Sequence, residues 1–380
     1  MGLQGLSMGQ ITDLVAGTRP KHPKNKYTQT QSLTDYPLMR LLFKDNKEII
    51  DGGAGTSVPA GSTTALNASY ETSVRLRDSA AFEWIRPFSV SANVLTQLMG
   101  TASGPMAFFR EHFMFDKLEK AMNSGDGKLY DTLNSRRDGC AASIHANLES
   151  AIARSTQPVS GPTSDFRGLF GILSTTSINA SSDTTGDFNG SQIVNSDGST
   201  TATVLGIDAS NVDNQRWRNW CANYSGTLNL PALDTMRRGM TRTNFMALDE
   251  FKTNGIRDGE GKRLILMGHG NSDEYEKLTN AGPDWKISGA TGDVNRATQY
   301  TFRGVDIVRT PVFDQISFAP IVGLWTKKIY GLNLQGIWMD EQDPQNHQQS
   351  STTFRVDLVS SAMMFCDDRR AGGWVMSTTR

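Results

Sequence analysis

The stretch that decides the fold is residues 353–374, TFRVDLVSSAMMFCDDRRAGGW. In its first part, apolar Phe354, Val356 and Leu358 alternate with residues that are mostly polar. A period of two predicts a strand with one buried face. This strand runs into the mixed-charge cluster Asp367–Arg370 and then into Ala-Gly-Gly. The pattern therefore predicts a long strand that ends in a charged turn.

Length and composition favour a large protein with much extended chain. The 380 residues can bury a sizeable core in one to three domains, and 36 glycines with 37% hydrophobic residues indicate more strand and loop than helix. The formal net charge of −1 provides no global basic field for nucleic-acid binding. Cys140, Cys221 and Cys366 are too widely spaced for a disulfide framework or a metal cluster, which favours a reducing cytosol. Residues 1–20 lack the apolar core of a signal peptide, and no run of about 18 apolar residues predicts a membrane span.

The first hundred residues are predicted to be mostly extended. Residues 1–48 have no sustained period, and a basic, proline-containing stretch within them is typical of an arm. A region rich in Gly, Ser and Thr follows. From Tyr70 to Arg77, residues suited to a buried strand face then alternate with polar or charged ones. Residues 49–82 are therefore expected to form a long hairpin that a single domain cannot easily bury. Phe88–Val94 repeats the alternation and predicts a further strand.

Two helices are predicted next. Pro105 suits the first turn of one helix, which would carry the four phenylalanines between Phe108 and Phe115. The second helix runs from Lys128 to Arg154, because its apolar residues recur at about every fourth position and form one stripe. At 1.5 Å per residue this helix is roughly 40 Å long. A helix of that length is expected to brace a flat body.

The second half of the chain is predicted to contain strands with scattered helices. Residues 172–213 are rich in Ser, Thr, Asn, Gly and Asp and contain no Lys or Arg, which predicts a surface excursion with a few short strands at most. Helices are expected from Pro231 to Arg242 and from Ser272 to Thr279. Strands are expected at Arg263–Met267, Tyr300–Arg309, Lys328–Trp338 and Thr353–Phe365. Strands in runs, with few helices between them, favour an α+β fold.

Motifs that could carry chemistry lack the context that they need. Gly268-His269-Gly270 resembles the opening of a dinucleotide site, but Asp273 replaces the third glycine and puts negative charge where a pyrophosphate would lie. Gly5–Gly9 matches a nucleophile elbow, yet no strand can precede it. The five histidines have no metal-ligand spacing, and the aspartates of residues 172–213 match no calcium loop. We therefore expect no enzyme activity and no catalytic, cofactor or metal site.

The order of these features resembles the major capsid proteins of tailed phages, whose Hong-Kong-97-type capsid fold is shared with encapsulin shells. The local matches are Phe166–Leu173 after the long helix, Phe302–Val308, and Phe354–Trp374 with its Arg-Ala-Gly turn. The resemblance implies an α+β capsid fold with four parts. They are an N-terminal arm (1–48), an extended hairpin loop (49–85), a peripheral domain (86–171 and 345–380, with a spine helix at 128–154) and an axial domain (mainly 172–344, including the excursion 172–213).

The resemblance also implies a function and a set of partners. Such a protein self-assembles into pentamers and hexamers that form an icosahedral shell, which packages double-stranded viral DNA. Its partners would be copies of itself, a portal protein, a separate scaffolding protein, an optional decoration protein, and DNA held non-specifically on the inner face, with no membrane. Its location would be the virion, after assembly in the host cytoplasm. The alternatives are an encapsulin-type bacterial compartment and, more distantly, a dinucleotide-binding enzyme that uses Gly268–Gly270.

Candidate contacts between subunits lie on the hairpin and in the C-terminal cluster, although plain solvated charge is an equal explanation for them. Some proteins of this family join subunits through an isopeptide bond from a hairpin lysine to an asparagine. No lysine occurs between Lys47 and Lys117, so the resemblance implies a shell held without covalent bonds. The candidate contact residues are Tyr70, Arg75, Arg77, Asp367, Asp368, Arg369 and Arg370.

Overall fold

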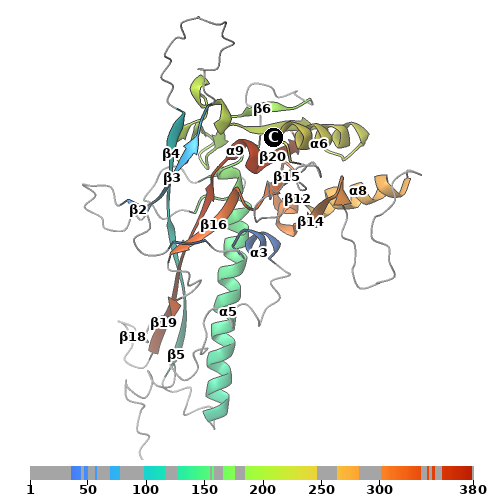
Figure 1. Cartoon of the computed structure of the whole chain (residues 1–380). Helices are drawn as coiled ribbons and strands as arrows, with labels where there is room; N and C mark the ends of the chain where they lie inside the picture. The colour runs from blue at the N-terminus through green and yellow to red at the C-terminus, as the bar shows by residue number, and fades with distance from the viewer. Residues whose placement is uncertain are drawn as a thin grey trace, which may run out of the picture.

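The computed structural model has an elongated half, in which a long helix runs beside two strands, and a compact half of sheet and helices (Figure 1). The predicted strand Phe88–Val94 and most of the predicted arm lie outside the residues that the structure describes. The described residues are 36–43, 47–49, 56–57, 69–77, 98–116, 126–154, 156–157, 166–175, 185–245, 263–281, 301–334, 340–341, 345–346 and 353–378.

The long helix, α5 (Asp126–Ile152), confirms the prediction with bounds shifted by two residues. Ile144, Leu148 and Ile152 recur every fourth residue and are buried, so one face of the helix packs against the protein. Arg136 donates from Nη1 to the carbonyl oxygen of Met114 at 2.7 Å. This contact helps to hold α5 against strand β5 (Ala107–Asp116).

Strand β5 lies where a helix was expected, and that prediction is wrong. It pairs antiparallel with β19 (Thr353–Cys366), from Asp116 opposite Thr353 to Ala107 opposite Ala362. Phe113 and Phe115 are both buried, in a cluster with Phe354 and its strand neighbours. A spacing of two places side chains on the same face of a strand but on nearly opposite sides of a helix. Pairing with a strand far along the chain therefore decided the structure of this segment.

Strand β19 is shared between two sets of partners. Its second part pairs antiparallel with β16 (Ile329–Leu334), and β1 (Lys47–Ile49) joins β16 in parallel. Its first part also pairs with β17 (Asp340–Glu341) and β18 (Gln345–Asn346). The strands predicted over 353–365 and 328–338 are confirmed, the second of them with a shorter described range.

A short helix, α3 (Pro37–Phe43), lies within the predicted arm. Leu38 and Phe43 are among its buried residues, and a Cβ on Gly331 of β16 would lie only 2.3 Å from the Phe43 ring. The backbone N–H groups of Leu38 and Met39 donate to the two carboxylate oxygens of Glu149 on α5, at 3.0 and 2.7 Å. This end of the predicted arm is therefore part of the core.

The compact half is built on a seven-stranded sheet in the order β13-β14-β12-β15-β20-β11-β6. Strand β20 (Gly373–Thr378) lies between β15, to which it is antiparallel, and β11, to which it is parallel. The stretch predicted as one strand at 300–309 is instead a tight hairpin, because Arg303 and Gly304 take the positive φ values that its turn requires. The other strands of the sheet are β6 (Asp187–Gly190), β11 (Asn219–Tyr224), β12 (Arg263–Met267), β13 (Thr301–Phe302), β14 (Val305–Arg309) and β15 (Ile321–Trp325).

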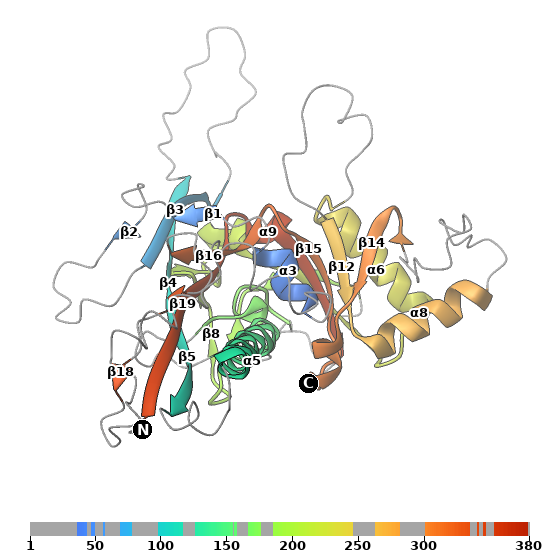
Figure 2. The same cartoon turned by 90° about the horizontal axis from the view of Figure 1, so that it is seen from below.

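Two helices accompany this sheet, α6 (Leu230–Arg242) and α8 (His269–Ala281). Helix α6 confirms its prediction and packs buried Met236 and Met240 into a core with Trp220 and Trp374. Those two indole rings meet edge to face, with centroids 6.3 Å apart. Helix α8 begins three residues before the predicted start. Figure 2, which looks along α5, shows β5 and β19 on one side and α6 and α8 on the other.

The base of the predicted hairpin is a three-stranded sheet of β2 (Thr56–Ser57), β3 (Ser69–Arg75) and β4 (Met99–Pro105). The antiparallel pairing of β2 with β3 agrees with the predicted hairpin. However, β3 also pairs along its whole length with β4, and Val74 is buried in the main core. The described part of the hairpin therefore finds partners within its own chain, contrary to the expectation.

The Ser/Thr-rich excursion has short strands, as predicted, but it is not confined to the surface. Four of its strands pair in two small hairpins, β6 joins the seven-stranded sheet, and Ile193, Val204 and Ile207 are buried in the main core. Arg369 begins the short helix α9, which precedes β20. The remaining elements are β7 (Ile193–Val194), β8 (Thr200–Thr201), β9 (Thr203–Val204), β10 (Ile207–Asp208), α9 (Arg369–Gly372) and the 3-10 helices η2 (Leu169–Gly171), η3 (Val212–Trp217) and η4 (Pro311–Gln315).

Candidate inter-subunit surface

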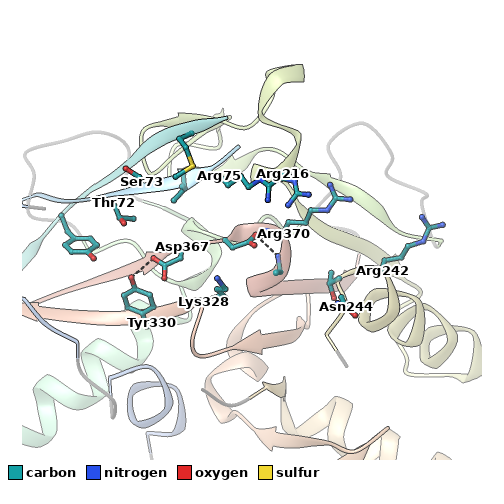
Figure 3. A pocket seen from close by; sticks show the side chains of 16 residues that line it. Thr72, Ser73, Arg75, Arg216, Arg242, Asn244, Lys328, Tyr330, Asp367 and Arg370 are labelled. Carbon is teal, nitrogen blue, oxygen red and sulfur yellow. Dashed lines mark hydrogen bonds between the residues drawn. The ribbon is translucent and has the colours of Figure 1, made fainter. Parts of the chain in front are cut away.

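The structure gathers most of the candidate contact residues in one cleft of about 860 Å³, which we call the basic cleft (Figure 3). Strand β3 contributes one wall together with Met99 of β4. The other lining residues come from η3, the end of α6 and the residues after it, the β15–β16 turn with the start of β16, and α9 with the residues before it. Five of the seven candidates line it. They are Tyr70, Arg75, Asp367, Asp368 and Arg370.

Local sequence explains how each wall presents its side chains. On β3, Val74 is buried in the core while Ser73 and Arg75 on either side of it are exposed, as the period of a strand requires. On the opposite wall, Asp368 is the N-cap of α9 and accepts from the backbone N–H groups of Arg370 and Ala371, both at 3.1 Å. Both walls are therefore held by backbone structure.

The cleft presents mostly positive charge, because five basic side chains line it against two carboxylates. Asp367 accepts a hydrogen bond from the Tyr330 hydroxyl at 2.8 Å, and Asp368 caps α9. Burial, together with the nearby Asp367 carboxylate, raises the pKa of Tyr330, so its hydroxyl stays protonated and donates. The five basic side chains are Arg75, Arg216, Arg242, Lys328 and Arg370.

Arg370 is fixed in place by an aromatic contact. Its guanidinium carbon lies 3.8 Å from the centroid of the Phe188 ring on β6. A cation stacked in this way keeps its charge while its position is restricted. Figure 3 shows the Arg370 side chain on the same side of the cleft as Arg216.

Arg369 is not exposed in the subunit, so the structure does not support its prediction as a surface contact residue. Its side chain is fully buried and donates to the carbonyl oxygens of Ile172 and Trp217, the second at 2.9 Å, and to Ser174 Oγ at 2.7 Å. Burial lowers its pKa to about 10, which still leaves it charged at neutral pH. Arg369 therefore connects the chain after η2, the end of η3 and the C-terminal turn.

Arg77 lies next to the cleft but does not line it. Its Nη1 atom is 2.6 Å from Asp213 Oδ1, and the two side chains are 34% and 66% exposed. An exposed ion pair of this kind contributes little to stability. It joins the hairpin base to η3 within one chain, and the role of Arg77 between subunits stays a prediction.

Sequence reasoning missed three basic residues of the cleft, Arg216, Arg242 and Lys328. They lie far apart in the sequence, at the ends of η3 and α6 and just before β16. Each lies near the end of a helix or just before a strand, where a basic residue is common and indicates no particular function. Only the tertiary fold brings them together, so no local signal could have identified them.

The glycine motif after β12 has a different explanation from nucleotide binding. The Asp314 carboxylate accepts from the backbone N–H groups of His269 and Gly270, at 2.9 and 3.2 Å. A Cβ on Gly268 would lie 2.4 Å from the same carboxylate. Strands β12 and β14 are parallel, so one strand-helix-strand unit does exist, but its helix N-terminus already holds an anion from the same chain.

Metal binding finds no support in the described part of the chain. Within these residues no group of three or more His, Cys, Asp or Glu side chains is placed to hold a metal ion. Likewise, no described helix has both the length and the apolar character needed to cross a membrane.

Solved structures with a similar fold are capsids. The chain matches the capsid asymmetric unit of cyanophage A-1(L) with a TM-score of 0.55 and 14% identity, over 99% of this chain and 100% of the other. It matches the capsid of the native GTA particle with a TM-score of 0.50 and 10% identity, over 82% and 85%. No family model and no curated protein matches the sequence. The chain has the capsid fold that was predicted from its sequence.

Proposed function

We propose that this chain is the repeating subunit of an icosahedral capsid that encloses double-stranded DNA. The observation that carries the proposal is the capsid fold over 99% of the chain, with no large part left over for another activity. The subunit is a structural protein that forms pentamers and hexamers and has no enzymatic role. The Asp314 carboxylate at the start of α8 speaks against the dinucleotide alternative.

The shape of the subunit supports the same proposal. The elongated half with α5, β5 and β19 extends away from the compact half (Figure 1), and such a shape suits contact with neighbours more than a compact monomer. Permanent interfaces bury roughly 2,000–5,000 Å² in total. Each subunit added to a closed shell binds several neighbours at once, so modest contacts sum to a stable particle.

Electron microscopy of the expressed chain, alone and together with a co-expressed scaffolding protein from the same genome, tests the proposal. We expect rings or closed hollow shells. A chain that stays monomeric at high concentration under both conditions, by light scattering, contradicts it. Nuclease-protected DNA inside particles purified from infected cells distinguishes a virion from an encapsulin-type compartment, which would hold a protein cargo.

The remaining partners follow from this proposal. A portal protein occupies one position of the shell, scaffolding is supplied by a separate protein, and a decoration protein is an optional addition on the outside. Assembly takes place in the host cytoplasm and the product is the virion. Affinity purification from infected cells, followed by mass spectrometry, identifies which of these proteins bind.

A further inference from the structure

The charge of the basic cleft suits an anionic occupant. Five basic side chains line it against two carboxylates, which is a formal excess of three positive charges. A cavity of about 860 Å³ is in the range that takes a peptide turn or a small anion. It is too small to admit a nucleic-acid duplex, so an acidic protein segment fits it best.

The chain itself carries an acidic segment of suitable form. Residues 168–215 contain five aspartates and no Lys or Arg. Within them, the β7–β8 turn at residues 195–199 has an exposed tip at Asp197. Asp197 Oδ1 accepts from Ser199 N at 2.8 Å and from Ser199 Oγ at 2.6 Å, and these bonds lower the pKa of Asp197. We call residues 195–199 the acidic turn.

The acidic turn is already rigid, which reduces the entropic cost of binding. Asn195 N donates to the Ser199 carbonyl oxygen at 2.8 Å, and Gly198 takes a φ of 80° that closes the turn. Its shape therefore does not depend on a partner.

The acidic turn cannot occupy the cleft of its own chain. Ser196 N donates to the Gln157 carbonyl oxygen at 2.7 Å and Gln157 N donates to Val194 O at 2.9 Å, so the turn is fixed at the end of α5. In Figure 2, β8 lies beside α5, and no residue of the turn lines the cleft. An occupant from the same segment must come from another copy.

We propose that the acidic turn of one subunit binds in the basic cleft of the next, with Asp197 facing Arg75 and Arg242. The two surfaces are different parts of the chain, so the contact is head-to-tail and can close a ring. The proposal rests on the proposed capsid function and names a contact within its capsomers. Because charges at the edge of the cleft take part, assembly should weaken as salt rises.

Charge reversals on each side test the contact. Asp197→Lys alters the turn, and Arg75→Glu with Arg242→Glu alters the cleft. Each change should raise the protein concentration at which assembly begins, measured by light scattering, by roughly tenfold. All three substitutions in one chain restore the opposite charges across the contact. They should bring that concentration back to within about twofold of the wild-type value.

Matched controls separate the contact from local damage. Asp208 Oδ1 accepts the same two hydrogen bonds, from Ser210 N at 2.8 Å and Ser210 Oγ at 2.6 Å. Asp208→Lys therefore removes an equivalent pair of hydrogen bonds and leaves the tip of the acidic turn unchanged. Arg238→Glu with Arg303→Glu reverses two exposed arginines outside the cleft. Both controls should assemble like the wild-type chain.

Three results overturn the proposal. The first is assembly of Asp197→Lys at the wild-type concentration, and the second is a triple variant that is as defective as the worse of its parents. The third is loss of binding to a short DNA duplex by the cleft variant alone while Asp197→Lys assembles normally, because that result assigns the cleft to phosphate. A wild-type chain that never assembles contradicts the proposed function, whereas normal shells from Asp197→Lys contradict only this contact.

Discussion

Arg369 uses all three nitrogen atoms of its guanidinium inside the subunit. Two of its hydrogen bonds reach backbone carbonyls of separate segments and one reaches a serine hydroxyl. The next residue, Arg370, lines the basic cleft instead. The charged cluster could be recognised as important from the sequence. The opposite roles of its two arginines could not, because nothing in the sequence distinguishes one arginine from the other.

We expect Arg369→Ala to lower the free energy of unfolding of the subunit by roughly 3 kcal/mol or more, because three buried acceptors lose their donor. Arg370→Ala removes one stacked cation and should cost about 1 kcal/mol or less. Urea denaturation of dissociated subunits, followed by circular dichroism, measures both values. Equal losses for the two variants would contradict the distinction.

At the scale of elements, hydrophobic periodicity identified the strands and helices that bury one regular face. It predicted α5, α6, β3, β12 and β19 with small errors at their ends. It failed for β5, where the paired Phe108 and Phe109 obscure the alternation and pairing with β19 decides the outcome. It also missed α3, whose seven residues are too few to establish a period and whose helix is held by contacts with α5.

The carboxyl group of Glu149 makes the attachment of α3 sensitive to pH. Burial raises its pKa from 4.5 to about 7, although the N–H groups of Met39 and Leu38 act in the opposite direction. The folded state therefore binds this proton more tightly than the unfolded state. The contribution to stability is present below about pH 4.5 and is lost as pH rises to about 7, a change on the order of 3 kcal/mol.

Comparison with Glu149→Gln checks this contribution, because the amide does not titrate. The free energy of unfolding should fall with rising pH between pH 4.5 and 7 more steeply for wild-type protein than for the variant. Denaturant titrations of both proteins across that range give the difference directly. Parallel curves would show that this carboxyl group has an ordinary pKa.

Two truncations distinguish the arm from the core. Deleting residues 1–30 should leave the fold of the subunit intact and reduce the yield of particles. Deleting residues 1–43 also removes α3 with its buried Leu38 and Phe43, and should destabilise the subunit itself by several kcal/mol. Circular dichroism reports the fold and sedimentation reports the particles. If the shorter deletion already unfolds the chain, the preceding residues also belong to the core.

At the scale of the whole molecule, the order of elements was enough to predict the capsid fold, because that order is set by local patterns along the chain. The basic cleft could be predicted only in part. Tyr70, Arg75 and the C-terminal cluster attracted attention through their place on a hairpin and in a charged turn. Their meeting with Arg216, Arg242 and Lys328 depends on how distant segments pack, which no local pattern encodes.

The absence of lysine between Lys47 and Lys117 leads us to expect a shell without covalent links from this hairpin. Arginine is always protonated and does not act as a nucleophile there. Mature particles boiled in detergent with reducing agent should release one band near 41.6 kDa. A ladder of linked dimers, pentamers and hexamers would contradict the prediction.

The position of β20 determines how late during synthesis a new subunit can complete its fold. Strand β20 joins β15 to β11 in the middle of its sheet, and β19 supplies the partner of β5. A ribosome must therefore translate beyond residue 366 before β5 can pair fully with β19, and beyond residue 378 before the seven-stranded sheet can close. Contacts between such distant segments form slowly and late. A chain whose synthesis stops before residue 353 lacks both β19 and β20 and can complete neither sheet, so we expect such a product to be unable to assemble.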